Sequence, residues 1–343
     1  MTGSGVVHRP VALSTVVYNG STDGDPWNSY WAGGRRASTF AGGGPQDAAL
    51  EIFWGRHFDE LLGDNTTADT HLLDIGAGSG AVTGFAFEAA QRLGCPLAVS
   101  CLDTSAAALA LVAEKHAGVK TVCASAADIP LSDGSIEAVV SQFGIEYAGI
   151  NAASEAGRIL RPGGSLALVM HHQDGAIYRE CRANADALDT TLDSGVLTAF
   201  KNLLLRACEL REGRGRPKDF AKADKALAPG VQALESIIRE QGKDCCGGSL
   251  FRLYTDIAHM YGRPYSYEAS EIKKWVKRAK QELGAFRARM QSMLDAALDE
   301  RTLALWRSAL TEAGLRLEDT QSLTMGEQQE VAAWVIRGEK SGA

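Results

Sequence analysis

The sequence predicts an α/β protein built on an open, mostly parallel sheet. Three observations support this prediction. Strand-like and helical patterns alternate from residue 70 to about 172. The first of these strands runs directly into a glycine-rich turn, and the second ends on Asp103, roughly twenty residues after that turn. Ligands of such sheets bind beyond the carboxyl ends of the strands, so we expect the functional site there.

The glycine-rich turn is the most informative stretch. It follows the apolar strand 71–75, which carries one acid, Asp74, and it reads Gly76-Ala77-Gly78-Ser79-Gly80. Glycine has no Cβ, so the backbone can approach a ligand closely and adopt conformations closed to other residues. Asp103 can accept hydrogen bonds from both hydroxyls of a ribose. The pattern predicts a nucleoside-containing cofactor, but it also satisfies the dinucleotide fingerprint, so the nature of the nucleotide stays open.

The other elements follow in chain order. The predicted helices cover 45–62 (ended by Gly63), 81–93, 105–116, 152–160 and 302–313 (ended by Gly314), and the predicted strands cover 97–102, 119–123, 136–141, 165–170, 315–317 and 331–336.

Residues 1–45 form an arm rich in Gly, Ser and Thr that we expect to be largely irregular. Three aromatic residues stand out in it, namely Trp27, Tyr30 and Trp31. They either plug a hydrophobic edge of the protein or close the arm over a bound ligand, and the pattern favours neither.

Four motifs in order resemble the class I S-adenosylmethionine-dependent methyltransferases. They are L-L-D-I-G-A-G-S-G, the acid that closes the second strand, S-A-A-D-I-P-L-S-D-G-S-I-E-A-V-V-S-Q, and R-I-L-R-P-G-G-S-L-A-L-V. The resemblance covers roughly residues 46–172 and returns at the C-terminus. It implies a Rossmann-like, doubly wound sheet of seven strands, with the last strand antiparallel to its neighbours.

The resemblance also implies S-adenosyl-L-methionine as the cofactor. Asp74 and the glycine turn would hold its methionine end, Asp103 its ribose and Ser125-Ala126 its adenine, and Gln142 would lie beside the sulfonium. Ser125 stands where the family often has an acid, so the bond to the adenine amine would be weaker here. The full implied set is Asp74, Gly76, Ala77, Gly78, Gly80, Asp103, Thr104, Ser125, Ala126 and Gln142.

Residues 173–300 interrupt the methyltransferase pattern as a helical insertion. We expect helices near 176–211, 217–241, 250–261 and 270–298. Because the insertion follows the fifth strand, its ends must lie beside the site, and we expect it to act as a substrate lid. The domains are then the arm 1–45, the cofactor-binding core 46–172, the insertion 173–300 and the closing segment 301–343.

A basic run within the insertion has two interpretations. Its members are either a solvated helix face, or they line the site and select an anionic substrate or membrane surface. They are Lys273, Lys274, Lys277, Arg278 and Lys280.

Four polar residues near the ends of the fourth and fifth strands are candidate catalytic groups. Glu146, Tyr147, His171 and His172 either complete hydrogen bonds at the sheet edge or serve the reaction, with His171, His172 or Glu146 as general base. Successive strand residues point to opposite faces, so at most one of the two histidines can face the substrate. No metal site is predicted, because a third ligand with recognisable spacing is missing.

Composition narrows the class of protein. The net charge of −7 argues against nucleic acid as the main partner, and no apolar run is long enough to cross a bilayer. The N-terminus lacks the pattern of a secretory signal, so we expect a cytoplasmic protein. The seven cysteines lack metal-ligand spacing and read as small buried hydrophobic residues.

These observations predict a methyltransferase that acts on an oxygen, nitrogen or carbon atom of a small molecule. Three alternatives remain. They are a methyltransferase for a lipid-linked or protein acceptor, an inactive cofactor-binding partner subunit, and a nucleotide-dependent oxidoreductase. The sequence leaves the oligomeric state open, including a homo-oligomer.

Overall fold

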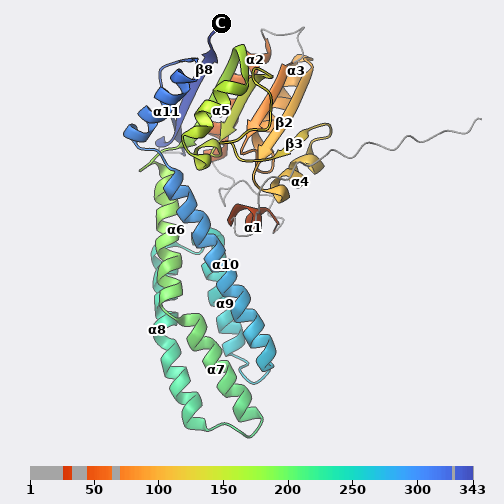
Figure 1. Cartoon of the computed structure of the whole chain (residues 1–343). Helices are drawn as coiled ribbons and strands as arrows, with labels where there is room; N and C mark the ends of the chain where they lie inside the picture. The colour runs from red at the N-terminus through yellow and green to blue at the C-terminus, as the bar shows by residue number, and fades with distance from the viewer. Residues whose placement is uncertain (1–25, 33–44, 64–69, 327–328, 343) are drawn as a thin grey trace, which may run out of the picture.

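The computed structural model describes residues 26–32, 45–63, 70–326 and 329–342. Figure 1 shows an α/β core and a long helical extension that leaves the core beside α1. Apart from α1 (Pro26–Ala32), the predicted N-terminal arm lies outside the described residues.

The described core contains a sheet in the order β3-β2-β1-β4-β5-β8-β6. The strands from β1 to β5 pair in parallel, and β8 pairs antiparallel with β5, as predicted for the last strand. The strands are β1 (Thr70–Ile75), β2 (Leu97–Asp103), β3 (Lys120–Cys123), β4 (Ile136–Gln142), β5 (Leu160–His171), β6 (Leu315–Leu317), β7 (Gln321–Met325) and β8 (Glu330–Lys340).

β7 is absent from the sequence prediction, which placed a loop there. β6 pairs with the C-terminal part of β8, and β7 continues along the same edge, pairing with its N-terminal part. The edge strand is therefore split in two, and it keeps the sheet at seven positions across. β7 reads Gln-Ser-Leu-Thr-Met, and its apolar alternation is limited to Leu323 and Met325, which is too short a run to indicate a strand.

Helices cover both faces of the sheet, which makes the core doubly wound (Figure 1). Neighbouring strand residues such as Leu72 and Leu73 belong to opposite apolar layers, because side chains alternate along a strand. One layer includes α2, α3 and α4, and the other includes α5 and α11. These helices are α2 (Pro45–Gly63), α3 (Ala81–Leu93), α4 (Ala106–Lys115), α5 (Asn151–Ile159) and α11 (Glu300–Glu312).

The insertion forms the helical extension seen in Figure 1. The single helix expected over 176–211 is two helices, because Ser194 and Gly195 form a turn in which Gly195 adopts a φ of 68°. No helix in the described ranges is both long and apolar enough to cross a membrane. The helices of the extension are α6 (Ala176–Asp193), α7 (Val196–Arg211), α8 (Pro217–Gln241), α9 (Ser249–Tyr261) and α10 (Ala269–Ala296), with a short 3-10 turn η2 (Cys245–Gly248).

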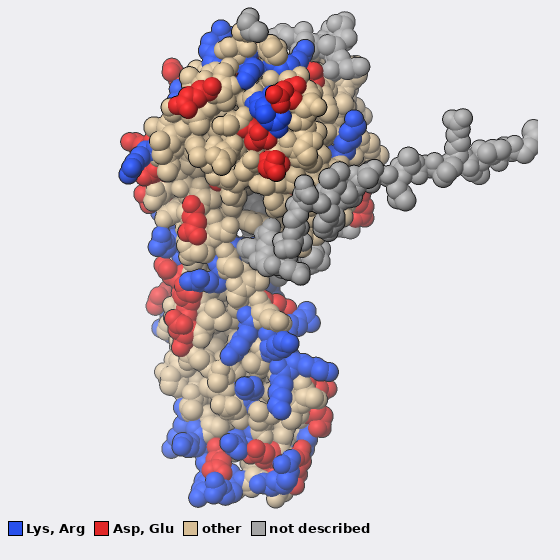
Figure 2. All heavy atoms as spheres, viewed as in Figure 1, with Lys and Arg blue, Asp and Glu red and all other residues tan. Residues whose placement is uncertain are grey.

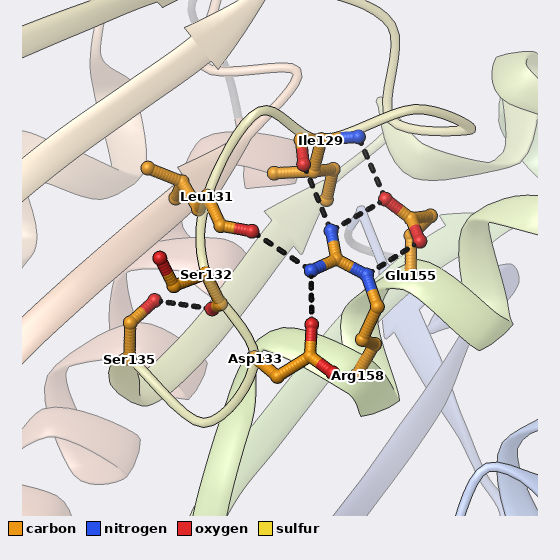
Figure 3. A network of polar contacts seen from close by, with 7 residues as sticks. All are labelled: Ile129, Leu131, Ser132, Asp133, Ser135, Glu155 and Arg158. Atoms are coloured by element: carbon orange, nitrogen blue, oxygen red, sulfur yellow. Dashed lines mark hydrogen bonds and ion pairs between the residues drawn. The ribbon is translucent and has the colours of Figure 1, made fainter.

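Arg158 of α5 organises the loop between β3 and β4 (Figure 3). Its guanidinium donates to the carbonyl oxygens of Ile129 and Leu131, both at 2.8 Å. It also pairs with Glu155 at 2.8 Å and Asp133 at 2.7 Å, and the Arg158 hydrogen bond lowers the pKa of Glu155. Arg158 is the first residue of the R-I-L-R-P-G-G motif, so this motif fixes the loop that leads away from Ser125 and Ala126.

His57 is an unusual group in the core. It lies on α2 with 5% of its surface exposed, beside the rings of Trp54 and Phe58. Neither ring nitrogen has a hydrogen-bond partner within the described parts of the chain. Burial, with a smaller contribution from Arg337, lowers the pKa of His57 to about 3, so the ring is neutral in the folded protein.

This burial predicts a pH-dependent stability. Below pH 6.5, the pKa of histidine in the unfolded chain, His57 is protonated in the unfolded state but stays neutral in the folded state. The free energy of unfolding therefore falls by about 1.4 kcal/mol for each unit that the pH is lowered towards 3. His57→Phe removes this loss, so relative to the native protein it should gain about 2 kcal/mol between pH 8 and pH 5. Urea unfolding at both pH values measures it. Exposed His259→Phe is the control, and an equal difference at both pH values would contradict the prediction.

Candidate functional site

A cavity of about 370 Å³ lies at the carboxyl ends of the parallel strands. Its size falls in the range of small-molecule and cofactor sites. Its walls come from the glycine turn, the ends of β2, β4 and β5, the loop after β3, and helices α1, α2 and α10. The predicted cofactor residues that line it are Gly76, Ala77, Gly78, Asp103, Thr104, Ser125, Ala126 and Gln142.

The three glycines of the turn have different roles. All three have positive φ values, which favours glycine at each position. Gly76 and Gly78 line the cavity, and a Cβ on Gly78 would lie 2.9 Å from the Trp31 ring. Gly80 is not among the lining residues. Its absent Cβ instead makes room for Val112 of α4, whose Cγ2 would lie only 2.3 Å away.

Asp103 is held in place by the backbone around it. Its Oδ2 accepts a hydrogen bond from the Gly78 amide at 2.9 Å, and its Oδ1 accepts one from the Ser105 amide at 2.8 Å. The carboxylate therefore ties the glycine turn to the start of α4. A carboxylate at this wall is of the kind that accepts hydrogen bonds from ribose hydroxyls.

Asp74 lies behind the glycine turn and does not line the cavity. Its Oδ2 accepts hydrogen bonds from the Thr83 hydroxyl at 2.7 Å and the Thr83 amide at 3.1 Å, while its Oδ1 has no partner among the described residues. Burial raises the pKa of Asp74 to about 7, and the negative charge of Asp103 adds to this. Asp74 therefore contacts the first turn of α3, and its role towards a cofactor stays a prediction.

Gln142 ends β4 inside the cavity and is positioned by a residue that the sequence did not indicate. The indole Nε1 of Trp54 donates to Gln142 Oε1 at 2.6 Å. Trp54 is fully buried on α2, so the orientation of Gln142 depends on the packing of α2 against the sheet. Ser125 is exposed at the cavity wall, and its hydroxyl accepts from the Ala127 amide at 3.2 Å.

His171 and Glu146 form a buried pair. The Nδ1 of His171 lies 2.8 Å from Glu146 Oε1, and the same oxygen accepts the His171 amide at 3.0 Å. His171 lines the cavity, whereas Glu146 lines a second cavity between α10 and η1 (Ile145–Ala148). The other ring nitrogen of His171, Nε2, is buried and has no partner within the described chain. A carboxylate on Nδ1 fixes the tautomer in which Nε2 can accept a proton.

The other two candidate catalytic residues, His172 and Tyr147, are less suited to act as a base. His172 does not line the cavity, because its ring stacks on Trp334 at 4.1 Å and its Nδ1 bonds the Gln173 carbonyl. Only one of the two histidines faces the cavity, as strand alternation predicted. Burial raises the pKa of Tyr147 well above its usual value, with a further contribution from Glu146. Tyr147 therefore keeps its proton and can donate a hydrogen bond, but it is not a base.

The arm and the insertion each contribute a small part of the cavity wall. Trp27 and Trp31 of α1 line it, as do Ser292 and Met293 near the end of α10. The rest of the insertion projects away from the core (Figure 1), so of the predicted lid the base of α10 is the part that reaches the cavity wall. Leu50, Phe143 and Met293 also line the cavity and were missed from sequence, since each reads as an ordinary apolar residue.

The basic run of α10 does not line the cavity, and its members are exposed. Figure 2 shows lysine and arginine side chains spread over the extension, with acidic side chains among them. The structure therefore supports the solvated-face interpretation.

A glycine turn, an acid after the second strand and a cavity at the carboxyl ends together define a nucleoside-binding α/β domain. Residues 73–168 match the family model described as a methyltransferase domain. This stretch of the chain is thus similar to a methyltransferase domain.

Two curated relatives match part of the chain. The ubiquinone/menaquinone biosynthesis C-methyltransferase of Methylobacterium nodulans is 34% identical over 133 residues, which are 36% of this chain and 52% of that protein. The enzyme of the same name from Rubrivivax gelatinosus is 33% identical over 118 residues, covering 34% and 44%. The chain spans about half the length of these relatives.

Solved structures resemble the chain loosely. A geranyl diphosphate methyltransferase in complex with GPP and sinefungin is 14% identical and has a TM-score of 0.40, with coverage of 85% of this chain and 78% of the other. The CMeT domain of the citrinin polyketide synthase is 12% identical and has a TM-score of 0.43, with coverage of 86% and 53%.

Proposed function

We propose that the protein is an S-adenosylmethionine-dependent methyltransferase that acts on a small molecule in the cytoplasm. One observation carries the proposal. The cavity brings eight of the predicted cofactor residues together with a buried histidine–carboxylate pair. In this arrangement the cofactor lies along the glycine turn and Asp103, and the acceptor lies against His171.

The residues of the cavity fit the cofactor. Gly78 contributes backbone without a side chain to the wall, beneath the Trp31 ring, and Asp103 places there a carboxylate of the kind that accepts hydrogen bonds from ribose hydroxyls. Ser125 presents a hydroxyl where the adenine is expected. S-adenosylmethionine supplies an electrophilic methyl group. The protein's tasks are then to orient the acceptor, exclude water and remove a proton.

His171 is the proposed general base. Its Nε2 accepts the proton that the acceptor loses as the new bond to the methyl carbon forms, and Glu146 stabilises the resulting imidazolium through Nδ1. Gln142, held by Trp54, lies beside the transferred group. An oxygen or carbon acceptor needs such a base, whereas an amine needs only to be presented unprotonated. The pair therefore supports an oxygen or carbon acceptor.

The cavity wall supports an uncharged, largely apolar acceptor. Within the described residues, no lysine or arginine lines it. The acceptor side carries Trp27, Leu50, Phe143, Tyr147 and Met293, which favour a flat or hydrocarbon-rich molecule. The names of the curated relatives favour a carbon acceptor over an oxygen acceptor.

Calorimetry with S-adenosylhomocysteine tests the proposal. We expect the native protein to bind this product and not NAD. Asp103→Ala should weaken binding by about 10- to 100-fold, because it removes charge-assisted hydrogen bonds of about 1.5–3 kcal/mol. Asp256→Ala, an exposed position on α9, is the matched control. The assignment would be refuted if the native protein did not bind S-adenosylhomocysteine, or if Asp103→Ala bound it with native affinity.

A further inference from the structure

Helix α1 is attached to the core beside Asp103. The side-chain oxygen of Asn28 accepts a hydrogen bond from the Ser105 hydroxyl at 2.9 Å. Ser105 is fully buried, caps the start of α4 and donates its amide to Asp103. Asn28 therefore attaches α1 to the same turn that positions Asp103, the residue proposed to bind the ribose.

α1 is also attached to the insertion. The guanidinium of Arg289, on α10, lies 4.7 Å from the centre of the Tyr30 ring and 4.8 Å from that of Phe286. Arg289 is only 8% exposed, so the cation contacts both rings at a site that holds little water. A cation over an aromatic face is attracted most strongly when both groups are desolvated.

On either side of these two attachment residues, α1 presents two indole rings to the cavity. Trp31 packs against the bare backbone of Gly78, and Trp27 contacts Tyr147 edge to face, with centroids 5.8 Å apart. Both indoles line the cavity. A ligand on the glycine turn would thus lie beneath α1, and its departure would require α1 to move.

We infer that Arg289 and Tyr30 form a clasp that holds α1 over the bound cofactor and so couples the insertion to cofactor retention. Arg289 acts as a positioning residue, because it reaches the cavity through Tyr30 and does not line it. The inference rests on the proposed function. It gives the helical extension a role at the site beyond the two wall residues of α10.

The test is the dissociation rate of tritium-labelled S-adenosylhomocysteine, chased from the full chain with unlabelled compound. Arg289→Met keeps the length of the side chain and removes its charge, and Tyr30→Leu removes the ring. Each should speed dissociation by about 2- to 30-fold. The double variant should be no faster than the faster single variant, because both break one contact. Tyr30→Phe should behave as the native protein.

Arg278→Met is the matched control, since Arg278 lies on the same helix in an exposed pair with Glu282. It should leave the rate unchanged. A merely structural role for Arg289 predicts equal harm from Tyr30→Phe and Tyr30→Leu, or additive effects in the double variant, and either result overturns the clasp. Unchanged dissociation from Arg289→Met does so too. If the native protein binds no S-adenosylhomocysteine, the proposed function itself is refuted. If the native protein binds it but the variants release it at the native rate, the clasp alone is refuted.

Discussion

His171→Ala is expected to lower the rate of methyl transfer by about 10²- to 10⁴-fold, the usual contribution of a positioned general base. The affinity for S-adenosylhomocysteine should stay nearly native, because the residues proposed to hold the cofactor remain in place. A fixed panel of small phenols and 1,3-dicarbonyl compounds is first screened for a member that the native enzyme methylates. Transfer to that compound is then measured as tritium from the labelled methyl group of S-adenosylmethionine.

The neighbouring histidine provides the control. His172→Ala should leave transfer near the native rate, since His172 stacks on Trp334 outside the cavity. Glu146→Gln should also slow transfer, because the amide cannot stabilise the imidazolium as the carboxylate does. Equal rates in His171→Ala and the native enzyme would remove the base assignment. Equal losses in the two histidine variants would point to a structural role at this end of β5.

Trp54→Ala is expected to lower the free energy of unfolding by about 3–5 kcal/mol, because it empties a fully buried indole site. It also removes the donor to Gln142 Oε1, so Gln142 loses its fixed orientation in the cavity. We therefore expect slower methyl transfer in the fraction that remains folded. Urea unfolding measures the first effect, and transfer assays below the unfolding transition measure the second.

Two variants separate these effects. Trp54→Phe keeps most of the ring but lacks the indole donor, so transfer should suffer more than stability. Trp306→Ala, in the apolar layer on the opposite face of the sheet, should cost comparable stability and leave transfer by folded protein unchanged. Native transfer in Trp54→Phe would show that the bond to Gln142 has no role in the reaction.

The sequence by itself determined the parallel core, the antiparallel last strand and the helical nature of residues 173–300. It also predicted a cofactor site at the carboxyl ends of β1, β2 and β4. A cavity lies there, and most of the predicted cofactor residues line it. The parallel core and the helical insertion could be predicted because they follow from local patterns, whereas the antiparallel last strand and most of the cofactor residues were implied by the resemblance to the class I methyltransferases. Strand and helix periodicity, glycine turns and the meeting of parallel strands at one edge depend on residues close together in the chain.

Only the tertiary structure decided which candidate residues lie together. It paired His171 with Glu146, 25 positions away, turned His172 towards Trp334 and placed Asp74 behind the glycine turn. It also linked Trp54 to Gln142 across 88 positions and directed the insertion away from the cavity. Contacts of this kind depend on how separate elements pack, and no local periodicity records the distance between side chains that meet only after the sheet and its helices assemble.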